Sequence, residues 1–222
     1  MKYLFLILSF ISFNFFHAQN SLDKTDEMID EMCVEFQRDP DLSDSIRIQN
    51  LNDKFIFNYL NQFSEQERES KIDNLYFRFQ KRCEAFRAYL YQKDPPKDDN
   101  WEILKSKPEI TISASEISQF KNTKNFHYFE YEGAETQVEI GKKYWKETFA
   151  DGTTSKLLMN WIDKTKFVLE FIESTNNGRK NFSRKGDKYN YELISKEKNY
   201  YWILVETPGQ NEILKFKLFE EK

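Results

Sequence analysis

His127 is the residue on which most familiar catalytic chemistry in this chain would depend. Beyond the first 18 residues it is the only histidine, so a serine or cysteine nucleophile has one possible histidine base. It alternates with Phe129 in a segment typical of a β-strand, which favours a side chain at a sheet surface. Zinc sites normally use several histidine or cysteine ligands. We therefore predict no catalytic residue, no metal and no other cofactor, and expect that the protein is not an enzyme.

Paired carboxylates are the alternative that would make the protein an enzyme. Two glutamates that face one cleft can act as acid and base on a glycosidic bond. The glutamates on predicted strands are Glu130, Glu132, Glu170, Glu192 and Glu206. No phosphate-binding loop accompanies them, because the glycines are never closer than eight residues.

A cluster of cations marks a predicted hairpin tip between residues 179 and 188. Such a cluster can bind a phosphorylated lipid, an acidic glycan or an acidic protein. The alternative is a solvated loop whose charge prevents pairing between sheet edges. Its members are Arg179, Lys180, Arg184, Lys185 and Lys188.

Aromatic side chains on the predicted strands are a second candidate binding feature. They can line a cavity for an apolar ligand or a sugar, or simply form the core. The candidate cavity residues are Tyr128, Trp145, Trp161, Tyr191 and Trp202.

The first 18 residues predict the compartment. A lysine at position 2 is followed by an apolar run and then by Ala18, the pattern of a signal peptide over residues 1–18. The run is too short to span a membrane, and no cysteine lies at the expected cleavage point for lipid attachment. We expect an exported protein, periplasmic or secreted, with no transmembrane segment in its mature chain. Cys33 and Cys83 are the only cysteines, and in an oxidising compartment we expect them to form a disulfide.

Glycine and charge divide the chain into two halves. All six glycines lie after residue 132, which favours helices before that point and tight turns after it. Residues 20–99 have a net charge of −6, and residues 100–222 a net charge of +1. We predict a helical region over residues 19–94, a linker over 95–108 around Pro95 and Pro96, and an antiparallel β domain over 109–222. The mild overall acidity argues against a nucleic-acid partner.

Apolar spacing predicts three helices in the first half. They are expected near residues 29–36, 43–63 and 64–90, each with one apolar face. Eight short strands follow, separated by turn residues, and their short connections require an up-and-down antiparallel sheet that closes as a barrel or packs as a sandwich. The strands are expected at 126–132, 136–140, 143–149, 156–162, 166–173, 187–196, 199–206 and 212–219, with a ninth at 109–114.

The β region also carries a resemblance. Asp151-Gly152-Thr153, Ser155-Lys156 and Trp161 form a hairpin and a tryptophan-bearing strand that resemble the small lipocalin-like β domains of exported bacterial proteins. The resemblance covers about residues 125–219 and implies a fold more than a function. The Gly-x-Trp signature of true lipocalins is absent from this sequence.

These observations together predict an α+β protein, a helical region followed by a lipocalin-like barrel. We expect a non-enzymatic module of the cell envelope that binds a small apolar or amphipathic ligand or acts as a scaffold. The alternative is an adaptor whose acidic helical half binds another envelope protein.

Overall fold

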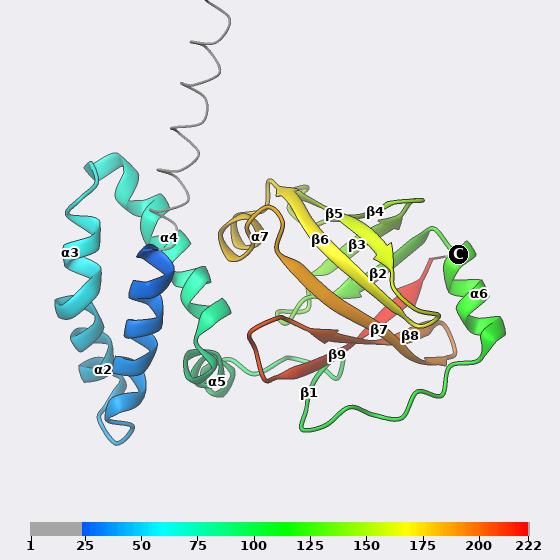
Figure 1. Ribbon diagram of the computed structural model, residues 1–222, viewed down its shortest axis with the longest axis horizontal. Coiled ribbons are helices and arrows are strands. Elements are labelled where there is room, and N and C mark those ends of the chain that lie inside the picture. Colours follow the sequence, from blue (N-terminus) through cyan, green and yellow to red (C-terminus); the bar gives the residue numbers. More distant parts are fainter. Residues whose placement is uncertain (1–23, 222) are drawn as a thin grey trace, which may run out of the picture. The chain divides into compact units, whose positions relative to one another are not determined.

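A computed structural model describes residues 24–221 and places a set of helices before a closed antiparallel β-barrel (Figure 1). The predicted signal peptide lies outside the described residues. The described chain forms two compact units, which we call the helical unit (residues 24–86) and the barrel unit (residues 87–221). None of its described helices is both long and apolar enough to cross a membrane.

The helical unit has more segments than the sequence predicts. Residues 24–38 are helical, and α2 (Asp44–Leu51) continues through a π-helical turn, η1 (Asn52–Ile56), into α3 (Phe57–Leu60). The third predicted helix is divided into two helices, α4 (Glu65–Arg82) and α5 (Glu84–Lys93). The boundary between the two units falls within α5. The break occurs because Cys83 has an extended backbone, with φ −108° and ψ 104°.

Aromatic packing and the disulfide hold the helical unit together. The ring of Phe36 packs edge-on against Phe79 and Phe86, with centroids 6.0 and 5.5 Å away, and Phe79 stacks on Phe86 at 4.3 Å. The predicted disulfide between Cys33 and Cys83 is present. It joins the helix of residues 24–38 to the break between α4 and α5, so the link connects two elements that already share a core.

The barrel unit contains nine strands, of which eight match the predicted segments. They are β1 (Trp101–Leu104), β2 (Asn125–Phe129), β3 (Glu135–Ile140), β4 (Tyr144–Thr148), β5 (Thr154–Trp161), β6 (Lys166–Ser174), β7 (Lys188–Glu197), β8 (Tyr200–Glu206) and β9 (Ile213–Glu220). From β2 to β9 each strand pairs antiparallel with the next, and β9 returns to β2, which closes the barrel.

Strand β1 and two helices were not predicted. The expected strand at 109–114 is wrong, because Ser113 and Glu116 form a capping box that starts α6 (Ala114–Asn122). The ninth strand is β1 instead, which lies in the predicted linker and extends the wall by pairing with residues 213–216 of β9. The first part of the predicted cation-rich segment, residues 179–188, lies in a helix, α7 (Asn177–Phe182).

Aromatic and aliphatic side chains fill the inside of the barrel. Phe120 of α6 packs against four rings, those of Phe126, Trp161, Phe167 and Tyr201, at centroid distances from 5.1 to 6.2 Å. Phe182 of α7 packs against the same core. Figure 1 shows α6 and α7 at opposite ends of the barrel, so each end has a helix that contributes a phenylalanine.

Candidate functional site

A cluster of buried polar side chains lies inside the barrel near α7. Glu147 and Trp145 occupy the buried positions of β4, and Tyr128 is buried on β2. Alternation in β4 explains why a carboxylate points inward, since Glu147 stands two residues after Trp145 on the same face. Glu130 follows β2 and also lies on this inner side, with a side chain that is 19% exposed.

Arg179 of α7 bridges the two carboxylates. Its guanidinium donates to Glu130 Oε1 at 2.7 Å and to the hydroxyl of Tyr128 at 3.1 Å. Its Nε lies 3.9 Å from Glu147. The Asn176 side chain accepts a hydrogen bond from the backbone N–H of Arg179 and caps α7. This bond helps to fix the position of the Arg179 backbone. Opposite charges therefore meet where α7 covers the barrel.

The remaining polar atoms of the cluster also bind within it. The Tyr128 hydroxyl lies 3.0 Å from Glu130 and 3.3 Å from Glu147, and Trp145 Nε1 donates to Glu147 at 3.2 Å. Thr136 donates to Glu130 at 3.1 Å. Buried polar groups are stable only when paired in this way. Through Arg179, these hydrogen bonds and ion pairs attach α7 to the wall of the barrel.

Burial changes the proton affinities of the cluster. Desolvation raises the pKa of the Glu147 carboxyl above its ordinary value, although Arg179 acts in the opposite direction. The same desolvation, together with the charges of Glu147 and Glu130, raises the pKa of Tyr128 well above the usual value for a phenol. The cluster therefore favours the protonated form of Glu147 more than water does.

Replacing Glu147 with glutamine tests whether this carboxyl titrates in the folded protein. A carboxyl whose pKa is raised on folding destabilises the folded state progressively as pH rises above 4.5, its ordinary value, and the cost levels off above the raised pKa. We expect the stability of the wild-type protein, measured against Glu147→Gln by urea unfolding, to fall as the pH rises through 4.5. A difference that stays constant from well below pH 4.5 to neutral pH would contradict the raised pKa.

The structure places the other predicted glutamates apart from this cluster. Glu170 lies 3.7 Å from Lys188, Glu192 lies 3.6 Å from Lys166, and Glu206 lies 2.5 Å from Lys107. Glu132 is an exposed turn residue. Of the five, Glu130 is the one that shares its partners, Arg179 and Tyr128, with another carboxylate. That carboxylate, Glu147, was not among the predicted residues. Its spacing from Trp145 was the signal that could have found it.

The structure gives the five predicted cations different surroundings. Arg179 is committed to the carboxylates of the barrel, and Lys188 pairs with Glu170. Lys180 and Lys185 are exposed, and Arg184 is half-buried. The segment does connect the antiparallel strands β6 and β7, as predicted, but the capped helix α7 within it points Arg179 inward while Lys180 faces solvent.

The five candidate cavity aromatics are also divided. Tyr128 and Trp145 are buried in the barrel core, and Tyr191 stacks on Phe167 at 5.3 Å. Trp161 is half-buried with the Lys121 ammonium 3.9 Å from its ring centre. Trp202 belongs to a separate cluster with Ile194 and Leu204. Four of the five therefore belong to or pack against one hydrophobic cluster, and Trp202 belongs to another.

His127 lies half-buried on β2, where strand alternation places it on the opposite face from Tyr128. Its imidazole is near two carboxylates, those of Glu135 and Glu221, and the donor atoms of the three residues all lie within 4.8 Å of one another. Among the described residues this is the group whose composition suits a metal ion. A shallow cavity of about 350 Å³ lies elsewhere, against α6, lined by Ala114, Ile117, Ser118, Lys121, Asn122 and Lys164.

Comparison with known proteins identifies no family. The sequence matches no protein-family model, and a search of curated proteins finds no match. The lipocalin-like resemblance therefore stays a prediction, and the closed barrel is evidence of architecture alone.

Proposed function

We propose that this protein is an exported, non-enzymatic module of the cell envelope or the extracellular space, in which the barrel is a stable scaffold. The observation that carries this proposal is the filled interior of the barrel. Barrels that carry small ligands keep an internal cavity for them. Here Trp145 and Phe167 are fully buried members of one large hydrophobic cluster. The filled core supports a scaffold over a container for an apolar ligand.

Export is supported by two independent features. The pattern of residues 1–18 is that of a signal peptide, and the disulfide is typical of proteins outside the cytoplasm. We expect the protein recovered from the cells that produce it to begin at Gln19 and to resist thiol labelling after denaturation without reductant. Intact mass spectrometry measures both. An unprocessed chain with two labelled cysteines would overturn export.

We propose no catalytic role because of the way in which the buried carboxylates are bonded. Glu130 and Glu147 are the closest approach to a catalytic carboxylate pair, and their oxygens already bind Arg179, Tyr128 and Trp145. An acid and base that work on a substrate need access to it. Because the carboxylate oxygens are already bonded to these neighbours, we assign the pair a structural role.

A ligand panel separates scaffold from container. The purified protein is heated with saturating fatty acids or lysophospholipids, and unfolding is followed by tryptophan fluorescence. A ligand that binds only the folded state raises the melting temperature in proportion to the logarithm of its concentration. We expect no shift. A shift that grows with concentration would replace the scaffold by a small-ligand carrier.

The adaptor is the second candidate, and exposed apolar side chains in the helical unit favour it. Val34 is 64% exposed and Phe57 is 54% exposed, and Ile46, Ile48 and Tyr76 are exposed as well. Residues 24–86 thus carry five of the nine large apolar side chains that are exposed in the described chain, although they form its smaller part. Exposed apolar surface is characteristic of protein-binding sites. The net charge of −6 over residues 20–99 suits a partner with a basic rim.

The adaptor is tested on the protein isolated from its own cells. Native mass spectrometry is expected to find a second polypeptide bound to the wild-type chain, and Phe57→Ser is expected to weaken that complex by about tenfold or more. The matched control is Ile162→Ser in the barrel unit, where the side chain is 65% exposed. A complex that both variants weaken equally, or a bare monomer, would count against binding through the helical unit.

A further inference from the structure

Barrel closure brings together three side chains that are far apart in the sequence. His127 is on β2, Glu135 is on β3 and Glu221 directly follows β9, 94 positions after the histidine. In the register of β2 and β3, His127 is opposite Gln137 and Phe129 is opposite Glu135, so the histidine and Glu135 are diagonal neighbours on one face. The backbone N–H of Glu221 donates to the carbonyl of Asn125 at 3.0 Å, which fixes the third residue beside them.

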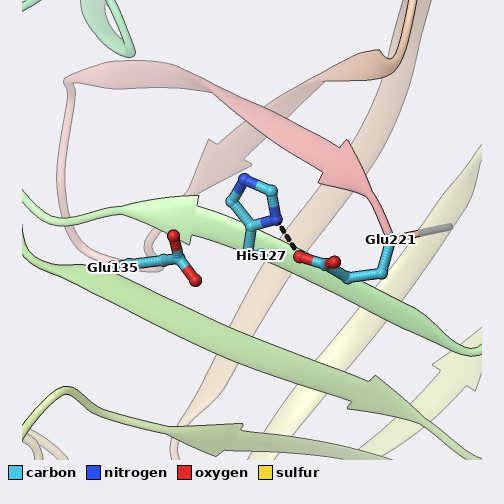
Figure 2. A group of neighbouring side chains, drawn as sticks. All are labelled: His127, Glu135 and Glu221. Atoms are coloured by element: carbon cyan, nitrogen blue, oxygen red, sulfur yellow. Dashed lines mark hydrogen bonds and ion pairs between the residues drawn. The ribbon is translucent and has the colours of Figure 1, made fainter.

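The side chains themselves converge. Figure 2 shows the imidazole between the two carboxylates, with His127 Nδ1 hydrogen-bonded to Glu221. One donor atom from each residue lies within 4.8 Å of the other two. Donor atoms that share a zinc ion lie roughly 3 to 4 Å apart, because each is about 2 Å from the metal. Both carboxylates are exposed, so their side chains have room to rotate toward a shared ion, Glu135 by giving up the hydrogen bond that it accepts from Gln137.

The imidazole is held in place by its neighbours. The ring of Phe219 stacks on it at a centroid distance of 5.1 Å and an interplanar angle of 7°. Phe129 contacts it edge-on at 5.5 Å and 82°. A ligand whose orientation is already restricted loses less conformational entropy when it binds a metal. The aromatic pair therefore prepares His127 for a ligand on the side where the carboxylates lie.

We propose that His127, Glu135 and Glu221 form a binding site for one divalent transition-metal ion of the zinc class. One nitrogen and two carboxylate oxygens match the mixed ligand sets of zinc, whereas calcium and magnesium prefer oxygen ligands alone. Water completes the coordination, because the site is open to solvent.

Isothermal titration with zinc chloride tests the site on the full chain after treatment with EDTA. We expect one zinc ion per chain, no detectable binding for His127→Ala, and at least about tenfold weaker binding for Glu135→Gln and Glu221→Gln. In the NMR spectrum of the wild-type protein, zinc should shift the imidazole signals that disappear in His127→Ala. Calcium is expected to bind more weakly than zinc.

The matched control is Glu139→Gln, which changes an exposed carboxylate on the same strand and the same face as Glu135. We expect it to bind zinc as the wild type does. The proposal is overturned if His127→Ala still binds zinc normally, if Glu139→Gln weakens binding as much as Glu135→Gln, or if calcium binds as tightly. Should His127→Ala fail to fold, the comparison of Glu135→Gln with Glu139→Gln decides the matter, because both side chains are exposed.

Discussion

Replacing Trp145 with alanine is expected to destabilise the barrel unit by about 4 kcal/mol, within the usual range for the loss of a buried large aromatic side chain. Trp145 is 1% exposed, and its ring packs against Phe167 at 6.2 Å and Tyr191 at 6.0 Å. The substitution removes these contacts and leaves a cavity. It also removes the indole N–H that donates to the buried Glu147.

Tryptophan fluorescence during urea unfolding measures this loss. All four tryptophans of the chain lie in the barrel unit, so three reporters remain after the substitution. The matched control is Trp161→Ala, which deletes the same atoms from a half-buried site and is expected to cost less than half as much. Equal losses at the two positions would mean that the interior is not packed as described. Addition of indole is expected to stabilise Trp145→Ala selectively, because it can enter the new cavity.

Removing the disulfide is expected to cost a similar amount in the helical unit. The bond between Cys33 and Cys83 closes a loop with a sequence separation of 50 residues. In the chain-entropy description, such a loop stabilises the folded state by about 4 kcal/mol, because the unfolded chain loses freedom. The double variant Cys33→Ser/Cys83→Ser removes this constraint and leaves two hydroxyls in place of the sulfurs, one of them at the fully buried position 83.

Circular dichroism at a helix-sensitive wavelength follows the helical unit, and tryptophan fluorescence follows the barrel unit in the same sample. We expect the helical transition of the double variant to move to lower urea. Reduction of the wild-type protein without any substitution is the control, and it should reproduce most of the shift. If neither treatment moves the helical transition, the bond does not stabilise this unit.

The sequence alone was sufficient for eight of the nine strands and for the expected pairing of the cysteines. Strand alternation is local, so Phe167 and Leu169 reveal a buried face without knowledge of any partner strand. Turn residues then separate eight segments, and their short connections permit only antiparallel neighbours. The disulfide followed from the fact that two cysteines allow a single intramolecular pair.

Some features had a local signal that the prediction did not use. Ser113 and Glu116 form the capping box that begins α6, although the segment before them was interpreted as a strand. The break at Cys83 has no such signal, since an apolar stripe continues on both sides of it. Propensity therefore predicts one helix where tertiary packing produces two.

Tertiary structure alone decided which polar residues meet. Pairing of β9 with β2 closes the barrel, and this closure separates an inner face, where Glu147 and Arg179 bind one another, from an outer face, where His127 meets Glu135 and Glu221. Nothing in the local pattern distinguishes Glu135 and Glu221 from the other exposed glutamates of the chain. The physical reason is that a strand's periodicity specifies two faces, whereas the register between strands specifies which side chains become neighbours on each face.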